Sequence, residues 1–214
     1  MMQPANPPNP ISPQPNPPLR DWITRWQSIA RRIRVPLGFL AAALYLFELW
    51  RRAPHPAAVA WSLALVGPGL WLRAWAAGTV KKNRELTVTG PYAYTRNPLY
   101  LGSMLIAGGF AAALLSWLVA LVLAVGFAVI YVPVIASEER YLRATFSGFD
   151  EYCRRVPRLI PRLTAAPGHT VAGSFSFSRY RRHREYNAAI GAALLYLSLL
   201  FLRPVLAAIF HESP

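Results

Sequence analysis

Long apolar runs alternate with short polar and basic segments along this chain. Runs with few or no charges cover about 36–50, 57–75, 97–137 and 188–209. A helix needs roughly 20 residues to cross the hydrocarbon core of a bilayer. The 41 residues of 97–137 carry no charge and suffice for two spans joined by a turn at Ser116-Trp117. The pattern therefore predicts an all-α, polytopic membrane helix bundle of about five transmembrane helices.

Local signals refine this prediction into segments. Gly67-Pro68-Gly69 predicts a kink in the second run. Residues 20–34 mix Arg with Trp and Ile at three- and four-residue steps, which is typical of an amphipathic helix on a membrane surface. We therefore expect a disordered Pro-rich tail at 1–19, an interfacial amphipathic helix at 20–35, a membrane core at 36–164, a basic interfacial segment at 165–186 and a C-terminal transmembrane helix at 187–214.

Charge predicts the compartment and the orientation. Only 15% of the residues are charged and the net charge is +14, which with the apolar runs indicates the lipid bilayer rather than nucleic acid as the partner. Nineteen of the 23 Lys and Arg lie in 20–34, 78–97 and 138–186, which five spans place on one side. By the positive-inside rule we expect an integral membrane protein whose N-terminus and active site are cytoplasmic. No Cys/His cluster has metal-ligand spacing, so no metal site is predicted.

The first polar segment precedes the uncharged block. Gly90-Pro91 predicts a turn, and Asn97-Pro98 predicts a helix start with Asn97 as the N-cap. Arg96 offers a planar fork for a carboxylate or phosphate. Aromatic faces and hydroxyls come from Tyr92, Tyr94 and Tyr100. The alternative is a membrane-interface loop with an aromatic belt and one basic residue that reaches toward water.

The second polar segment follows the block. Glu138 and Glu139 are adjacent carboxylates at the end of the predicted fourth span, where one could hold an ammonium group. Alternatively, Glu139 and Arg143 are spaced i,i+4 and could form a solvated surface pair. The arginines at 154–162 could bind lipid headgroups or a substrate carboxylate.

In this order the motifs resemble the isoprenylcysteine carboxyl methyltransferase and phospholipid methyltransferase superfamily of integral membrane enzymes. The resemblance covers about residues 80–162 and rests on Gly90-Pro91-Tyr92, Arg96-Asn97-Pro98-Leu99-Tyr100, the hydrophobic hairpin, Glu138-Glu139-Arg140-Tyr141-Leu142 and Arg155-Val156-Pro157-Arg158-Leu159-Ile160-Pro161. Asn97 stands where the family commonly has His. Val134-Ile135-Ala136-Ser137 stands where the isoprenylcysteine enzymes tend to carry Arg, which favours a different acceptor, such as an amine lipid or a small lipophilic compound.

The resemblance implies methyl transfer from S-adenosylmethionine to an O, N or S atom of a lipophilic, membrane-dissolved acceptor. The implied cofactor-binding residues are Gly90, Pro91, Tyr92, Tyr94, Asn97, Pro98, Tyr100, Glu138 and Glu139, with the acidic pair on the methionine amino group. The residues implied near the acceptor, as catalytic residues, are Arg96, Tyr152, Arg155 and Arg158. Two other functions stay open: an NADPH-dependent membrane reductase of a sterol-like double bond, and a non-enzymatic membrane adaptor.

Overall fold

The structure, a computed structural model, describes residues 29, 36, 38–81, 84–168 and 175–211. Within these residues all regular structure is helical, without a strand, which confirms the predicted all-α class. The predicted tail at 1–19 lies outside the described residues, as does the amphipathic helix at 20–35 apart from Ile29. The division of the chain into segments stays a prediction.

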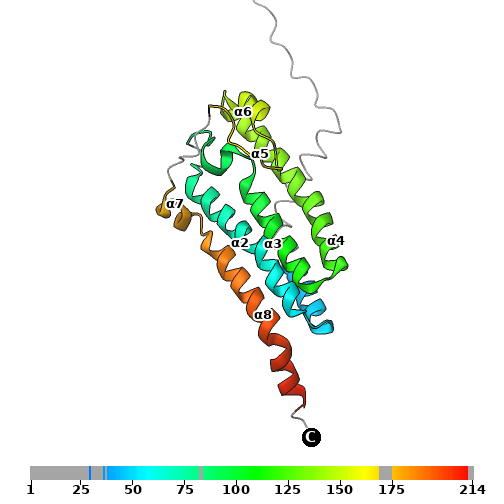
Figure 1. The fold of residues 1–214 in the computed structure, drawn as a ribbon. Helices are drawn as coiled ribbons and strands as arrows, with labels where there is room; N and C mark the ends of the chain where they lie inside the picture. The colour runs from blue at the N-terminus through cyan, green and yellow to red at the C-terminus, as the bar shows by residue number, and fades with distance from the viewer. Residues whose placement is uncertain (1–28, 30–35, 37, 82–83, 169–174, 212–214) are drawn as a thin grey trace, which may run out of the picture.

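The helices form an elongated bundle (Figure 1). A helix over 38–51 comes first. The elements that follow are α2 (Pro56–Thr79), a 3₁₀ turn η1 (Gly90–Ala93), α3 (Pro98–Leu114), α4 (Trp117–Gly126), a π-helical segment η2 (Phe127–Tyr131), α5 (Val132–Thr145), α6 (Phe149–Arg155), α7 (Phe177–Arg182) and α8 (Tyr186–His211). α4, η2 and α5 join into one helix, Trp117–Thr145.

The predicted hairpin turn is present between α3 and α4. Leu115 takes the left-handed conformation with φ 49° and ends α3. Ser116 is the N-cap of α4, and its hydroxyl accepts a hydrogen bond from the N–H of Val119 at 3.4 Å. A Ser at this place satisfies one of the amides that a new helix leaves without a partner. The uncharged block is therefore two antiparallel helices, as its length predicts.

Two described helices are long and apolar enough to cross a membrane: Pro56–Thr79 and Trp117–Thr145. Only 17% and 22% of their most apolar windows are buried inside the protein, so most of this apolar surface faces outward. Such a surface suits lipid contact, since a core helix of a soluble protein buries its apolar face. Pro98–Leu114 and Tyr186–Leu202 are apolar but shorter. This all-helical architecture is consistent with a helical membrane protein, and the number of five spans stays a prediction.

Glycines bring α2 and α3 close together. A Cβ added at Gly69 would lie 2.8 Å from the carbonyl oxygen of Gly102, and one added at Gly109 would lie 2.5 Å from Cγ2 of Val66. Small residues at such crossings let helix backbones approach closely, as is common between membrane helices. Pro68 lies inside α2, which continues to Thr79, so the Gly-Pro-Gly sequence does not divide the helix.

Candidate functional site

Backbone hydrogen bonds join the two polar segments at one end of the bundle. The N–H of Arg96 donates to the carbonyl of Pro157 at 2.9 Å, and the N–H of Arg162 donates to the carbonyl of Tyr94 at 3.0 Å. The loop before α3 and the stretch after α6 therefore lie side by side. Both are at the end of the bundle where α5 ends and α6 lies (Figure 1).

Local chemistry shapes the first segment. Gly90 is buried with φ +60°, a backbone conformation that glycine adopts without strain. The turn places Tyr92 in the interior, where its carbonyl accepts a 2.8 Å hydrogen bond from the hydroxyl of Tyr152 on α6. Burial raises the pKa of Tyr92 and of Tyr152 well above the usual tyrosine value, so both hydroxyls stay protonated at neutral pH.

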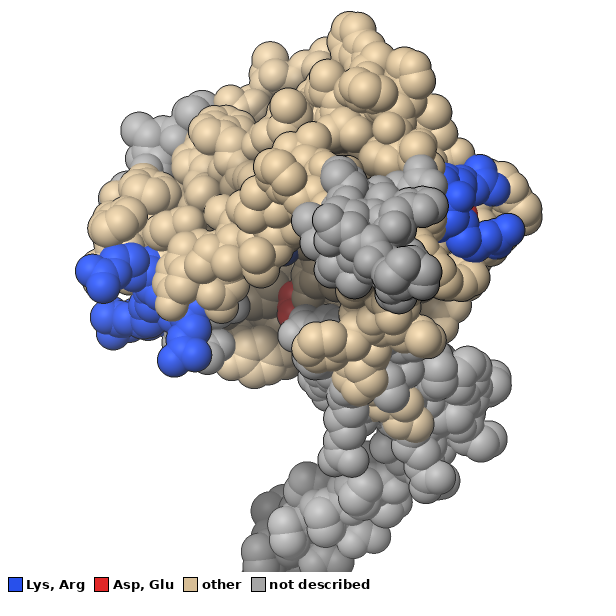
Figure 2. All heavy atoms as spheres, turned by 90° about the horizontal axis from the view of Figure 1, so that it is seen from below, with Lys and Arg blue, Asp and Glu red and all other residues tan. Residues whose placement is uncertain are grey.

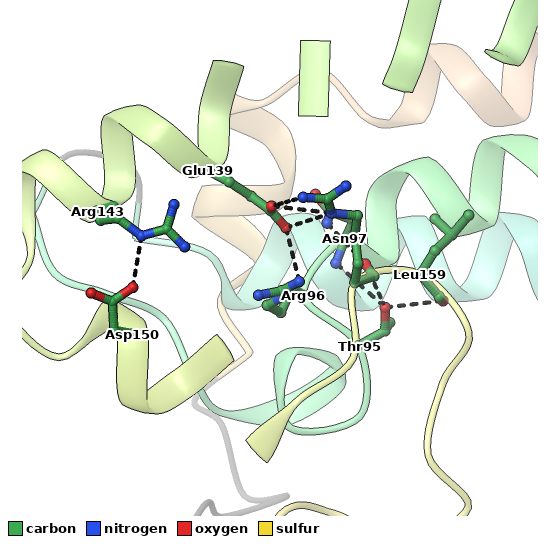
Figure 3. A network of polar contacts seen from close by, with 8 residues as sticks. Thr95, Arg96, Asn97, Glu139, Arg143, Asp150 and Leu159 are labelled. Atoms are coloured by element: carbon green, nitrogen blue, oxygen red, sulfur yellow. Dashed lines mark hydrogen bonds and ion pairs between the residues drawn. The ribbon is translucent and has the colours of Figure 1, made fainter. Parts of the chain in front are cut away.

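Glu139 is the centre of a buried ion network (Figure 3). Its side chain is 6% exposed and contacts Arg96 Nη2 at 3.3 Å and Arg158 Nη2 at 2.5 Å. The alternative i,i+4 surface pair with Arg143 is wrong, because Arg143 instead contacts Asp150 at 2.6 Å. Since two guanidinium groups already neutralise Glu139, this carboxylate is poorly suited to hold an ammonium group. It links α5 to the two polar segments.

Asn97 is the N-cap residue of α3 with Pro98 in the first turn, as predicted. Its side chain does not cap the helix, however. Its Nδ2 donates to the carbonyl of Arg158 at 2.9 Å, beside a 3.1 Å bond from the hydroxyl of Thr95 to the carbonyl of Leu159 (Figure 3). Asn97 therefore holds the backbone of Arg158, whose side chain binds Glu139, and this contact needs only an N–H donor.

A polar cavity of about 650 Å³ lies beside this network. It is lined by residues of α2, of the loop before α3, and of α3, η2, α5 and α6, together with Glu185. Four of the nine acidic residues of the chain line it: Glu85, Glu138, Glu139 and Glu185. The basic residues that line it are three of 23: Arg73, Lys81 and Arg96. In a chain of net charge +14, this local excess of carboxylates favours a cationic ligand.

Charge is segregated in a similar way on the end of the molecule opposite α6. Figure 2 shows Lys and Arg side chains at two opposite edges of that face. Acidic atoms are visible in a hollow near its centre. Most of the remaining described surface in this view is neither acidic nor basic. On this face, acidic atoms are therefore visible in the hollow and basic groups gather at the edges.

Eight predicted site residues line the polar cavity: Tyr92, Arg96, Asn97, Pro98, Tyr100, Glu138, Glu139 and Tyr152. The lining does not include Gly90, Pro91, Tyr94, Arg155 and Arg158. The first three shape the turn, and Arg158 acts on the site through Glu139. The Nε of Arg155 donates to Glu151 at 2.7 Å, and its Nη1 donates to the carbonyl of Pro167 at 3.3 Å. The structure does not bring Arg155 to the cavity.

An ion pair that sequence reasoning did not place in the site also lines the cavity. Arg73 on α2 contacts Glu185 at 2.7 Å, and its Nη1 donates to the carbonyl of Leu99 and to the hydroxyl of Ser103. Arg73 lies within the apolar run 57–75, which the sequence predicts as a membrane span. The signal for a functional role was available, since a charged residue in an apolar helix is costly and needs a partner. Glu185, 112 residues away, offered no such signal.

The segment around α7 positions Glu185. The N–H of Ser176 and the Nε of Arg179 donate to the carbonyl of Gly78 at 2.9 and 2.8 Å. His183 Nδ1 lies 3.0 Å from the carbonyl of Ala77. These carbonyls belong to the last turn of α2, which has no internal partners for them. The end of α2 thus anchors α7, and the chain enters α8 beside the cavity.

A second, apolar cavity of about 940 Å³ adjoins the polar one. It lies between the helix over 38–51 and the helices α3 and α4 with η2. Ser103 and Tyr131 line both cavities. Tyr131 ends the π-helical segment, and Pro133 just beyond it has no N–H to donate within the helix. The irregular turn places Tyr131 where the two cavities meet.

Over its described residues the chain is an all-helical protein with two membrane-capable helices, a polar cavity at one end and an apolar cavity that shares two lining residues with it. Residues 61–148 match the family model of phospholipid methyltransferases. This match confirms the resemblance that the motifs predicted and supports methyltransferase activity.

Two relatives carry names of a different kind. The chain is 41% identical over 110 residues to the cobalt-zinc-cadmium resistance protein CzcN of Cupriavidus metallidurans, covering 51% of this chain and 50% of that protein. It is 40% identical over 103 residues to the nickel-cobalt-cadmium resistance protein NccN of Alcaligenes xylosoxydans xylosoxydans, covering 48% and 47%. The chain thus spans about half the length of these relatives. No solved structure matches it.

Proposed function

We propose that this protein transfers a methyl group from S-adenosylmethionine to a lipophilic, membrane-dissolved acceptor at the cytoplasmic face. The observation that carries the proposal is the acidic polar cavity, built by the two motif segments within the family match. S-adenosylmethionine is a sulfonium cation with an ammonium and a carboxylate. When bound, it supplies an electrophilic methyl group that leaves a neutral thioether behind.

The residues present fit this cofactor. Glu138 accepts a 2.8 Å hydrogen bond from the hydroxyl of Tyr100 and is exposed at the cavity, so it is the carboxylate of the predicted pair suited to an ammonium group. The Nε of Arg96 is buried and has no partner among the described residues, which suits a carboxylate ligand. Tyr92, Tyr100 and Tyr131 provide aromatic faces for an adenine ring or a sulfonium.

The alternative reductase needs a different pocket. NADPH carries three phosphate groups, and the three basic residues of the lining already pair with carboxylates: Arg73 with Glu185, Lys81 with Glu85 and Arg96 with Glu139. The lining therefore suits phosphate groups poorly. Calorimetric titration of the purified protein with S-adenosylmethionine and with NADPH separates the two functions. We expect binding of the first only, and the reverse result would overturn the proposal. A protein that binds neither cofactor would favour the adaptor.

A variant sharpens this test. Glu138→Gln should weaken S-adenosylmethionine binding by about 10- to 100-fold, because a charge-assisted hydrogen bond contributes roughly 1.5–3 kcal/mol. Glu151→Gln is the matched control: Glu151 is half exposed, contacts Arg154 and Arg155, and does not line the cavity. Equal affinity of both variants would exclude Glu138 from the cofactor site.

The acceptor can be identified by incubating the protein with native lipid extract and a labelled methyl donor. Because the two relatives are named for metal resistance, the extract is best taken from cells grown with and without cobalt or cadmium. The labelled product then gives both the acceptor and the methylated atom.

A further inference from the structure

We propose that Glu185 is the group that accepts the proton of the acceptor while the chain of the acceptor lies in the apolar cavity. This inference rests on the proposed methyl transfer. It adds a catalytic residue outside residues 61–148, the part that matches the family, and an acceptor class: a molecule with a hydrocarbon chain and an O–H, N–H or S–H nucleophile.

The first step of the argument is the state of the Glu185 carboxylate. Its side chain is 13% exposed and lines the polar cavity. Arg73 donates from Nε at 3.1 Å and from Nη2 at 2.7 Å to the same oxygen, Oε2. The other oxygen, Oε1, has no partner among the described residues. Arg73 therefore fixes the orientation of the carboxylate and leaves one oxygen able to accept a hydrogen bond.

The second step is the position of this pair between the cavities. The Nη1 of Arg73 donates to the hydroxyl of Ser103, and Ser103 lines both the polar and the apolar cavity. A molecule whose chain occupies the apolar cavity can therefore place its polar end beside Ser103 and the Arg73–Glu185 pair. The lining of the apolar cavity is almost entirely apolar, which suits a hydrocarbon chain.

The third step is the balance of the reaction. The acceptor X–H donates a hydrogen bond to Glu185 Oε1, then X forms a bond to the methyl carbon as the C–S bond breaks with its electron pair on sulfur, and the proton passes to Oε1. The positive charge of the sulfonium and the negative charge of the carboxylate are lost together, so the step leaves no net charge change in the cavity. Glu139 cannot take this role, because Arg96 and Arg158 occupy both of its oxygens.

The test uses full-length protein, S-adenosylmethionine, and dodecanol, dodecylamine and dodecanethiol as probes. We expect the wild type to methylate at least one of them. Glu185→Gln keeps an oxygen for Arg73 but removes the base, and should lower kcat by about 10²- to 10⁴-fold. Its calorimetric Kd for S-adenosylmethionine should change much less than kcat does, because Arg73 pairs with Glu185 and Glu138 is the proposed partner of the ammonium group. Glu185→Asp should retain more activity than Glu185→Gln.

Gly108→Leu tests the apolar cavity separately. Gly108 lines that cavity, and an added Cβ meets no atom within 4 Å, so the larger side chain fills open space. It should raise KM for the probe and reduce the calorimetric binding of the probe, with cofactor affinity unchanged. Gly67→Leu on α2 is the matched control, since Gly67 has equal room and does not line the cavity.

Each failure has its own signature. Wild-type protein that binds no S-adenosylmethionine overturns the proposed function and this inference with it. Wild-type protein that binds S-adenosylmethionine but methylates none of the probes overturns the acceptor site alone. A Glu185→Gln variant with wild-type kcat overturns the role of Glu185 as the base. In these last two cases the proposed methyl transfer from S-adenosylmethionine still stands.

Discussion

At the scale of single residues, Glu139 has the most consequential contacts. Its carboxylate joins α5 to Arg96 and Arg158, so the two polar segments share one buried charge. Glu139→Gln removes that charge and leaves the largely buried Arg96 without a counterion. Breaking a buried pair in this way costs about 3–5 kcal/mol. We expect a fall of that size in the free energy of unfolding, measured by denaturation in detergent.

The control for Glu139→Gln lies on the same helix. Arg143→Gln breaks an ion pair with Asp150 in which both side chains are at least half exposed. Surface pairs contribute about 0–1 kcal/mol, so this variant should unfold almost as wild type does. Equal losses in the two variants would show that Glu139 is no more important than a surface residue.

The burial of Tyr152 predicts that the stability of the fold decreases at alkaline pH. Burial raises the pKa of Tyr152 and of Tyr92 above the unfolded value of about 10, so the folded state holds these protons more tightly. The stabilisation is complete below pH of about 10 and falls as pH rises above it. Tyr152→Phe should cost about 1–3 kcal/mol at neutral pH, because the buried carbonyl of Tyr92 loses its donor.

Tyr152→Phe should also lose less stability than wild type does as the pH rises, because one of the two buried hydroxyls is absent. Unfolding midpoints of wild type and Tyr152→Phe, compared between pH 7 and 11, check both effects. A wild type whose stability is constant to pH 11, or a Tyr152→Phe curve parallel to it, would contradict the burial of these hydroxyls.

The sequence located eight of the residues that line the polar cavity, because these eight stand in short contiguous motifs. It missed Arg73 and Glu185, which lie 112 residues apart and meet only because α7 binds the end of α2. The sequence suggested an ammonium partner at the Glu138-Glu139 pair. It could not tell that Glu139 forms a buried ion network while Glu138 stays exposed at the cavity. That difference depends on the helix rotation that buries Glu139 and exposes Glu138.

At the scale of elements, the packing of α2 on α3 depends on glycine. Gly69→Ala places a Cβ 2.8 Å from the carbonyl of Gly102, which is backbone and cannot rotate away. The helices must separate, at a cost of about 1–3 kcal/mol. Gly67→Ala, two residues away on the same helix, meets no atom within 4 Å and should be neutral or stabilising. Thermal unfolding of both variants checks the prediction, and a stable Gly69→Ala would contradict the close crossing.

The elements themselves were predicted unevenly. The α3–α4 turn followed from block length and Ser116, whose hydroxyl caps the new helix. The π-helical segment did not follow, since Pro133 could equally produce a kink or a break. The attachment of α7 depends on carbonyls at the end of α2, which a sequence does not display.

At the scale of the whole molecule, the structure separates two ends. The 24 residues of α2 rise about 36 Å at about 1.5 Å each, more than the roughly 30 Å core of a bilayer. Arg84 follows one end of α2 and Arg52 precedes the other. Leu115 lies near Arg52, since its neighbour Ser116 donates a hydrogen bond to Glu48 and Arg52 contacts the same carboxylate. Arg181 and Arg84 belong to the same end of α2, since α7 binds the last turn of α2 and Arg84 follows that turn.

These positions test the proposed multi-pass topology with the active site in the cytoplasm. Cys153 is the only cysteine, so Cys153→Ser gives a background for single substitutions. In intact cells, a membrane-impermeant maleimide should label Arg52→Cys and Leu115→Cys, whereas Arg84→Cys and Arg181→Cys should react only after permeabilisation. All four side chains are exposed, so reactivity depends on the side of the membrane. The reverse pattern would overturn the orientation but keep the spans. Labelling of Arg84→Cys and Leu115→Cys from the same side would show that α2 does not cross the membrane. It would also overturn the placement of the acidic cavity at a membrane face.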